Sequence, residues 1–261
     1  MNVLKKINSF GKMEMLTVVA QQQPFPEHFH ETFCISLITK GIECVKLKNR
    51  EIYSEAGSFS ITNPREVHSN PVIDNEIPLS FHTLYLDQHT LDTFAQKEGV
   101  FFEKRSFSDE TLEVAFFSLK KAFEKNDPIV LEKTLKEFIV LLLPHSSVKA
   151  NDDDFCFKED WNLIFEFIDT KFKEKITVED ISRIALMDKF NFSKKFKNTT
   201  GMSPMNYILM KRIFSAKAII NKSTNLTDLA YTFNFSDIAH FSKTFKRFVG
   251  IAPKQYKNNL T

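Results

Sequence analysis

The sequence predicts an α+β fold in two parts. An N-terminal β-barrel that carries a helical segment comes first, and an all-α domain of two helix-turn-helix units joined by a long helix follows. Three observations support this. A sixteen-residue pattern occurs twice near the C-terminus, short alternating apolar segments occupy about the first third of the chain, and positive charge is concentrated near the C-terminal end.

The repeated pattern defines the unit of the C-terminal domain. Residues 192–207 and 241–256 share eight identities over sixteen aligned positions without a gap. Each copy follows a short segment, residues 178–185 and residues 226–233, in which apolar side chains recur at helical spacing. A repeat of about fifty residues, built from two helices and a turn, predicts two helix-turn-helix units.

Polar caps and glycines predict where these helices begin and end. Thr177 and Asp188 are the predicted N-caps of the two helices of the first unit, and Gly201 is the predicted left-handed stop. In the second unit, Ser236 is the predicted cap and Gly250 the stop. We therefore expect the second helix of each unit to lie between a polar cap and a glycine.

The turn inside each unit differs in sequence. Leu186 stands in the first turn, and Asn234 stands at the matching place in the second. Asparagine tolerates a left-handed backbone conformation, whereas leucine rarely adopts one. We therefore expect the first turn to be less regular than the second.

A long helix is predicted between the units, from residue 204 to about residue 221. Ser203 and Pro204 supply its cap and first-turn proline, and its apolar residues fall on one side. At 1.5 Å per residue it spans roughly 27 Å, which approaches the roughly 34 Å of one turn of B-DNA. This length favours two recognition helices that enter successive major grooves on one face of the duplex.

Charge separates the two halves of the chain. Residues 160–261 hold 17 Lys and Arg against 9 Asp and Glu, a net charge of +8; the whole chain carries +2, so residues 1–159 carry −6. This asymmetry indicates that the C-terminal domain binds nucleic acid.

Residues from about 161 to 256 resemble the DNA-binding domain of the AraC/XylS family of transcription regulators. The motifs that carry the resemblance are residues 176–181, 192–207, 226–230, 235–237 and 241–256. The resemblance implies seven helices, double-stranded DNA and RNA polymerase as partners, and activation of transcription. Leu186 and Asn234 depart from the family pattern, which often has glycine at these places.

The two predicted recognition helices supply the candidate DNA contacts. In the first helix, we expect groove contacts from Phe190, Asn191, Ser193 and Lys194, and backbone contacts from Lys189, Lys195 and Lys197. In the second, we expect groove contacts from Ile238, Ala239, His240, Ser242 and Lys243, and phosphate contacts from Lys246 and Arg247. Because Ile238 and Ala239 offer only apolar contact, we expect the second unit to discriminate bases less. For each lysine alone, the alternative is a solvated surface charge.

Short alternating segments predict a β-barrel or sandwich in residues 1–88. The predicted strands are residues 33–38, 42–47, 51–53, 58–62 and 79–86. Their order resembles the cupin-type sensor domain that precedes the DNA-binding domain in many AraC-family regulators. This second resemblance rests on His28, His30, Gly41, Gly57, Pro64, Glu66 and His68.

Three of these residues raise the question of a metal. Enzymatic cupins bind a metal through two His, a Glu and a later His; here His28, His30 and His68 would supply the nitrogens, with Glu31 or Glu66 as the carboxylate. Glu31 directly follows His30 and points to the other face of a strand, and Glu66 stands where cupins usually have Gly. The sequence therefore favours histidines that line a pocket mouth or make structural hydrogen bonds, with no metal, no cofactor and no catalytic residue.

A barrel of this size is able to hold one small-molecule effector. The candidate pocket residues are Phe25, His28, His30, Ile35, Leu37, Arg65, His68, His82 and Tyr85. Arg65 is suited to clamp a carboxylate with two hydrogen bonds. The alternative for Arg65 is a solvated surface position.

Residues 89–144 change to a helical period. Two apolar stripes predict helices, one over residues 112–123 and one over residues 129–143, which Asp127 and Pro128 open. Such stripes most often serve packing within one chain. The family resemblance implies a second use, as the homodimer interface of the sensor domain, and the sequence leaves both open. The polar residues 145–159 are the predicted linker to the C-terminal domain, residues 160–261.

We expect no signal peptide and no transmembrane segment, because the apolar runs are too short. Cys34, Cys44 and Cys156 lack metal-ligand spacing, which favours reduced thiols in a cytoplasmic protein. The sequence therefore predicts a ligand-responsive, sequence-specific DNA-binding regulator that is not an enzyme. The alternatives are a metal-dependent cupin enzyme and a regulator whose N-terminal domain binds a partner protein.

Overall fold

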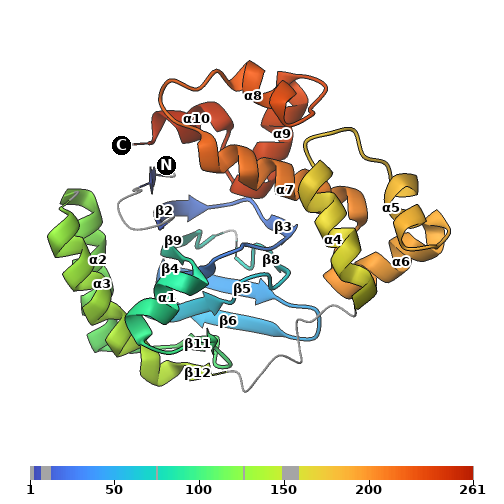
Figure 1. Cartoon of the computed structure of the whole chain (residues 1–261). Helices are drawn as coiled ribbons and strands as arrows, with labels where there is room; N and C mark the ends of the chain where they lie inside the picture. The colour runs from blue at the N-terminus through green and yellow to red at the C-terminus, as the bar shows by residue number, and fades with distance from the viewer. Residues whose placement is uncertain (1–2, 7–12, 75, 126, 149–158, 261) are drawn as a thin grey trace. The chain divides into compact units, whose positions relative to one another are not determined.

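The computed structural model describes residues 3–6, 13–74, 76–125, 127–148 and 159–260, and the chain forms two compact units (Figure 1). Residues 1–24 and 29–150 make up most of the N-terminal domain, and residues 151–258 most of the C-terminal domain. Strand β3 (Phe25–His28) is hydrogen-bonded into a sheet of the N-terminal domain and is described with it. Most of the predicted linker, residues 149–158, lies outside the described residues.

The N-terminal domain is built on two main sheets. The six-stranded sheet has the order β1 (Val3–Lys6), β2 (Glu14–Gln21), β9 (Leu79–Leu86), β4 (Phe33–Lys40), β7 (Phe59–Thr62) and β11 (Ser106–Phe107). The four-stranded sheet has the order β3, β8 (His68–Asn70), β5 (Ile42–Lys46) and β6 (Glu51–Glu55). A short pair, β10 (Val100–Phe101) and β12 (Ser147–Val148), lies apart. These strands confirm the predicted β-rich N-terminal part.

Helices cover one face of the six-stranded sheet. They are α1 (Gln88–Ala95), α2 (Glu110–Lys125) and α3 (Pro128–Leu142), followed by the 3-10 turn η1 (Leu143–His145). Asp127 caps α3 through its carboxylate and Pro128 opens it, as the sequence predicted. The apolar stripes of α2 and α3 join Ile35, Leu37 and Leu84 in the main hydrophobic core. The helical segment therefore packs within its own chain, which confirms one of the two uses that the sequence left open.

The other face of β4 and β9 carries both polar and apolar side chains, because Ile38 and Phe81, two residues along from Ser36 and Thr83, pack with Val18 in a small apolar cluster. Ser36 and Thr83 are paired in register, and their hydroxyl oxygens lie 2.7 Å apart in a buried hydrogen bond. Glu43 on β5 is buried and hydrogen-bonds Ser60 on β7 and Asn70 on β8. The carboxylate of Glu43 thus bonds to both main sheets, and the space between them holds polar side chains.

The described residues of the C-terminal domain form seven helices, the number that the family resemblance implies. They are α4 (Glu159–Lys171), α5 (Val178–Ile184), α6 (Lys189–Thr200), α7 (Pro204–Ile219), α8 (Leu226–Thr232), α9 (Ile238–Val249) and α10 (Pro253–Asn258). Trp161 on α4 stacks against Phe192 and packs on Phe196 of α6, at ring-centroid distances of 6.2 and 5.7 Å. In the second unit, Phe241 and Phe245 occupy the matching buried positions.

The helix ends follow the predicted signals, with one correction. The side chains of Thr177 and Asp188 cap α5 and α6, and Gly201 and Gly250 end α6 and α9 at φ of 82° and 87°. The predicted cap Ser236 is wrong: Asp237 caps α9, because its carboxylate accepts from the backbone of the third helical residue. Ser236 instead donates its hydroxyl to the Asp237 carboxylate at 2.9 Å.

The two turns have the same geometry, so the expectation of a less regular first turn is wrong. Leu186 has a φ of 51° and Asn234 a φ of 56°. In both turns, the next residue donates its backbone N–H to a carbonyl five residues back, from Met187 to Ser182 and from Phe235 to Ala230, each at 3.0 Å. These paired hydrogen bonds hold leucine in a conformation that it adopts only at a cost.

Candidate nucleic-acid interface and effector site

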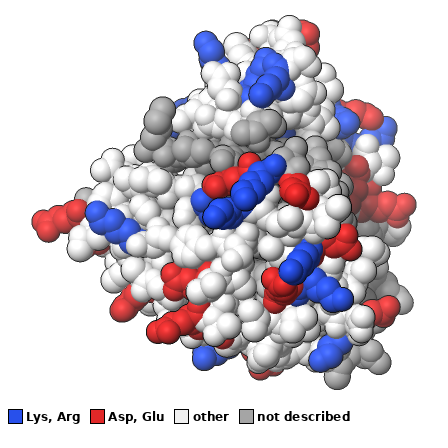
Figure 2. Space-filling view, turned by 90° about the vertical axis from the view of Figure 1, so that its left-hand side faces the viewer, with Lys and Arg blue, Asp and Glu red and all other residues white. Residues whose placement is uncertain are grey.

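Net charge alone does not locate the DNA interface on the surface. Figure 2 shows one face of the molecule on which basic and acidic side chains are interspersed among uncharged ones. The candidate DNA interface is described from the side chains of α6 and α9, the second helix of each helix-turn-helix unit.

Helix α6 presents an exposed row of Phe190, Lys194 and Lys197, spaced four and three residues apart. Phe190 is 77% exposed, which is unusual for an aromatic side chain without a partner surface. Two other predicted contacts are engaged within the domain. The ammonium of Lys189 lies 2.8 Å from Glu179, and the Asn191 amide nitrogen lies 2.5 Å from the Asp188 carboxylate.

Helix α9 presents the matching row Ala239, Lys243 and Lys246, forty-nine residues further along. His240 is exposed, with Nδ1 3.3 Å from the Ser236 hydroxyl oxygen and its ring edge-on to Phe235 at 5.1 Å. The two rows share lysines at two positions and differ at the first, where Phe190 and Ala239 stand.

The predicted DNA contacts all lie at the surface of the domain. Ser193 and Ser242 are half-buried, and Ile238 is 37% exposed. The other predicted contacts are exposed; they are Lys189, Phe190, Asn191, Lys194, Lys195, Lys197, Ala239, His240, Lys243, Lys246 and Arg247. The opposite sides of α6 and α9 carry the buried Phe pairs of the core.

Sequence reasoning missed Arg212 on α7. Its buried guanidinium donates to the backbone carbonyls of Phe172 and Glu174, both at 2.6 Å, and of Asn234 at 3.2 Å. The segment 172–174 leads into the first unit, and Asn234 stands in the turn of the second. No local pattern marks this role, because the accepting carbonyls lie 22 to 40 residues from Arg212 in sequence.

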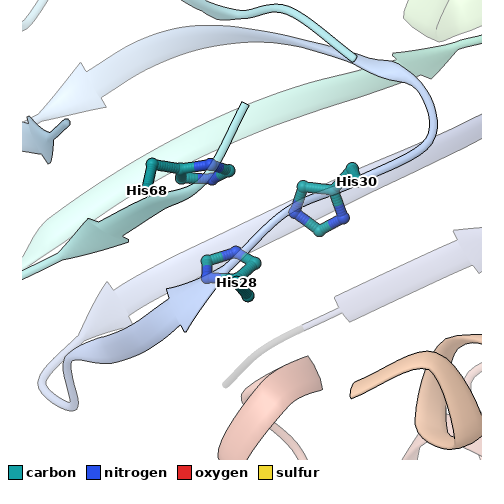
Figure 3. Close-up of side chains that lie close together, drawn as sticks. All are labelled: His28, His30 and His68. Atoms are coloured by element: carbon teal, nitrogen blue, oxygen red, sulfur yellow. The ribbon is translucent and has the colours of Figure 1, made fainter. Parts of the chain in front are cut away.

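In the N-terminal domain, the structure brings together His28, His30 and His68 (Figure 3). One side-chain nitrogen from each ring lies within 4.8 Å of the other two. The rings of His30 and His68 are 5.6 Å apart between centroids, and Tyr85 stands edge-on to His30 at 5.2 Å. Four of the nine predicted pocket residues therefore form one cluster, and Phe25 lies beside it with its ring 6.0 Å from that of His28.

Backbone carbonyls orient two of the three rings. Nδ1 of His28 lies 2.7 Å from the carbonyl oxygen of Pro26, and Nδ1 of His68 lies 2.8 Å from that of Glu66. Burial lowers the pKa of His28 to about 4, although its hydrogen bond to Pro26 acts in the opposite direction. His28 is therefore neutral at pH 7, and its Nδ1 proton faces the carbonyl.

Three predicted pocket residues lie on the wrong face of the sheet. Ile35 and Leu37 belong to the core under α2 and α3, and the His82 ring packs edge-on against Phe117 of α2 at 5.9 Å. A strand that is buried on both faces has no alternation of apolar and polar residues to show which side chains point toward the pocket. The side chains predicted to face the pocket are therefore one residue out of register with those that do. The side chains of β4 and β9 that point away from the helices include the hydrogen-bonded pair Ser36 and Thr83 instead.

The side chain of Arg65 lies at the surface. It is 67% exposed and pairs with Glu31 at 2.9 Å, which matches the solvated alternative rather than a ligand clamp. The carboxylate of Glu66 accepts two hydrogen bonds from the buried Arg105, at 2.7 and 2.8 Å. Both carboxylates that the sequence offered as metal ligands are therefore engaged by arginines.

Two family models match the chain. One is described as an AraC-like ligand binding domain and matches residues 10–139; the other is described as a helix-turn-helix domain and matches residues 181–259. The HTH-type transcriptional regulator YbfI of Bacillus subtilis is 27% identical over 240 residues, which is 84% of this chain and 82% of that protein. The HTH-type transcriptional activator RhaS of Yersinia pestis is 21% identical over 280 positions that cover 100% of both proteins.

Solved structures share the whole fold. Apo ToxT from Vibrio cholerae superimposes with a TM-score of 0.64 at 18% identity, covering 98% of this chain and 100% of that one. ToxT bound to an unsaturated fatty acid gives a TM-score of 0.59 at 16% identity, covering 95% of each chain.

Among the described residues, no helix has the length and apolar character needed to cross a membrane. The relatives are transcription regulators, which agrees with the two capped helix-turn-helix units and the separate β-rich domain. The chain is a member of the AraC family of transcription regulators, with an AraC-like ligand-binding domain followed by a helix-turn-helix DNA-binding domain.

Proposed function

We propose that this regulator binds its operator by placing α6 and α9 in successive major grooves of the duplex. The observation that carries the proposal is the pair of matching exposed rows, Phe190–Lys194–Lys197 and Ala239–Lys243–Lys246. Each row stands on a helix that begins at an aspartate cap and ends at a left-handed glycine. The two helices are therefore built alike and offer lysines from the same places.

The connection between the units supports simultaneous binding. Helix α7 has 16 residues, and at 1.5 Å each it spans about 24 Å. The buried Arg212 on α7 bonds to backbone on both sides of it, so the two units are tied to one rod. Successive grooves on one face of B-DNA recur every roughly 34 Å, and the helix-turn-helix units at the two ends of α7 extend the span beyond the rod itself.

The N-terminal domain is the proposed effector site, and the buried polar side chains between its two main sheets favour a small ligand that makes hydrogen bonds. Glu43, Ser36, Ser60 and Thr83 are all buried between the two main sheets. Burial raises the pKa of Glu43, although hydrogen bonds from Ser60 and Asn70 act in the opposite direction. One structural neighbour, ToxT, binds an unsaturated fatty acid. These hydroxyl and carboxyl groups, with the apolar cluster of Val18, Ile38 and Phe81 on the same face of the sheet, suit a small ligand that has both polar and apolar parts.

We further propose that the protein activates transcription in the cytoplasm through contact with RNA polymerase, as a homodimer. The relative RhaS is named as an activator, which supports activation. Exposed apolar side chains on α2 and α3 support dimerisation through this helix pair; they include Val114 at 68%, Ile129 at 81% and Val140 at 54% exposed. The relatives are named as transcription regulators, which supports a regulator rather than an enzyme.

The test is binding of the full-length protein to DNA from upstream of its own coding sequence and of neighbouring genes, measured by fluorescence anisotropy over a salt series. Saturable binding that exceeds binding to random DNA and falls steeply with salt is expected. A pool of small metabolites should shift this affinity. Equal affinity for every DNA, including fragments selected by this protein from a random pool, would contradict sequence-specific recognition.

A further inference from the structure

The three clustered histidines approach one point from neighbouring strands of one sheet. His28 ends β3, His30 follows two residues later, and His68 begins β8, which pairs with β3. Figure 3 shows their rings around a common centre. We propose that His28, His30 and His68 form a metal site that binds one divalent transition-metal ion, of the zinc, cobalt and nickel class, in the N-terminal domain.

The spacing of the ring nitrogens fits this use. Three atoms that are at most 4.8 Å apart surround a point that is at most about 2.8 Å from each of them, whereas zinc–imidazole bonds measure roughly 2.0–2.1 Å. Each ring therefore has to move by less than about 1 Å to bind an ion at the centre. Rotation of the side chains about their own bonds achieves a movement of this size without a change of the backbone.

The hydrogen bonds of the rings point to the same chemistry. A metal-bound histidine almost always donates its second ring N–H to a carbonyl or a carboxylate, which fixes the tautomer and the orientation of the ring. His28 and His68 both have this arrangement, through Nδ1 to the carbonyl two residues earlier in the chain. With a proton on Nδ1, each ring carries its lone pair on Nε2.

The loop that carries His68 is held firmly against His30. Arg65 donates its backbone N–H to the carbonyl of His30 at 2.7 Å, although its side chain lies in solvent. Glu66, whose carbonyl orients His68, is fixed by the bidentate pair with the buried Arg105. The site is therefore supported before an ion arrives, which reduces the cost of binding one.

The donor set also decides which ions fit. Glu31 and Glu66 are both paired with arginines, so three imidazoles remain as the ligands. Imidazole suits zinc, copper, nickel and cobalt, whereas magnesium and calcium require oxygen ligands. Three protein ligands leave a fourth position for water or another small molecule, as in zinc sites of the open type.

The test uses the full-length protein, freed of any affinity tag and stripped of metal with a chelator that is then removed. Titration with Zn²⁺ in a calorimeter should show one ion per chain. His30→Gln and His68→Gln should each weaken this binding at least tenfold, whereas His89→Gln, an exposed histidine on α1, should leave it unchanged. Zn²⁺ should raise the melting temperature of the wild type and of His89→Gln, and not that of His30→Gln.

Cobalt provides a second measurement, because its spectrum reports the ligands. Co²⁺ in the proposed site should give visible bands without the intense near-ultraviolet absorption of cobalt–thiolate bonds. Strong thiolate absorption would assign the ion to a cysteine such as Cys44 and overturn the proposal. The absence of saturable Zn²⁺ binding by the wild type would also overturn it. Folded His30→Gln and His68→Gln proteins that bind Zn²⁺ as tightly as the wild type would overturn it too. Circular dichroism of each metal-free variant establishes that it is folded.

Discussion

Nη1 of Arg212 lies 3.2 Å from the backbone carbonyl oxygen of Asn234, in the turn of the second helix-turn-helix unit. The same guanidinium donates to Phe172 and Glu174, in the segment that leads into the first unit. One buried side chain on α7 thus holds backbone from both units.

Arg212→Lys should lower the free energy of unfolding of the C-terminal domain by about 2–4 kcal/mol, because a single ammonium cannot serve three carbonyls that point at a planar fork. The only Trp of the chain, Trp161, is buried in this domain, so its fluorescence during urea unfolding of the full-length protein reports the change. Lys211→Met, which removes a partly exposed ion pair with Asp169, should cost about 1 kcal/mol or less. Equal losses in the two variants would contradict the assigned role of Arg212.

The first turn stores strain that glycine would relieve. Leu186 is 93% exposed and has a φ of 51°, so its side chain gains no burial while its backbone is left-handed. Leu186→Gly should therefore stabilise the C-terminal domain by about 0.5–1 kcal/mol. This is the net of two effects: glycine relieves the left-handed backbone strain, but it also raises the conformational entropy of the unfolded chain. Urea unfolding followed by Trp161 fluorescence measures it.

Asn234→Gly is the matched control for this change. Asn234 has nearly the same φ, 56°, but asparagine tolerates that region better. Its substitution should change stability by less than that of Leu186. A destabilised Leu186→Gly protein would show that the leucine makes a contact that outweighs its backbone strain.

The sequence predicted the C-terminal domain better than the effector site, for a physical reason. Caps and stops such as Asp188 and Gly201 act within one turn of helix, so a local pattern is enough to find them. The pairing of Glu66 with Arg105 joins residues 39 apart, and no local pattern reveals it. In strand β4, Ile35 faces the helices and Ser36 faces the space between the two main sheets. Because the strand is buried on both faces, its sequence lacks the alternation of apolar and polar residues that would show which side chains point which way.

The buried pair of Glu66 and Arg105 should matter far more than the exposed pair beside it. Arg105 is 8% exposed, and removing its partner leaves a buried charge without compensation. Glu66→Ala should therefore destabilise the N-terminal domain by about 3–5 kcal/mol. Differential scanning calorimetry of the full-length protein should show the loss as an earlier transition of this domain.

Arg65→Ala is the control, because it removes the neighbouring ion pair with Glu31, whose side chains are 67% and 58% exposed. It should cost about 0–1 kcal/mol. If Glu66→Ala melted at the same temperature as Arg65→Ala, the buried pair would contribute little to stability.

Acid should weaken the N-terminal domain partly through His82. Burial against α2 lowers the pKa of His82 to about 4, with the nearby Lys120 acting in the same direction. The unfolded chain takes up this proton near pH 6.5 and the folded chain does not, so the contribution of His82 is complete above about pH 6.5 and is lost as the pH falls toward 4. Stability should therefore fall between these values, and His82→Gln should show a shallower fall in urea unfolding at pH 7, 6 and 5. The exposed His89→Gln should keep the slope of the wild type, and an unchanged slope in His82→Gln would contradict the assignment.

Substitutions in the two rows of exposed lysines should distinguish contacts to bases from contacts to the DNA backbone. Lys194 and Lys243 lie nearer the N-terminal ends of α6 and α9, where recognition helices reach base edges, and Lys197 lies one turn further on. Lys194→Ala and Lys243→Ala should each cost about 1–3 kcal/mol on the selected operator and much less on random DNA. Lys197→Ala should weaken binding to operator and to random DNA alike. It should also reduce the slope of the logarithm of the binding constant against the logarithm of the salt concentration by about 0.9.

Lys97→Ala is the control for nonspecific loss of charge, because Lys97 is an exposed residue of the N-terminal domain outside α2 and α3. It should change neither operator affinity nor salt dependence. Equal losses on operator and random DNA for Lys194→Ala, Lys243→Ala and Lys197→Ala would mean that all three lysines contact phosphates. Base discrimination would then have to come from the other predicted groove contacts, among them Phe190, Asn191 and His240.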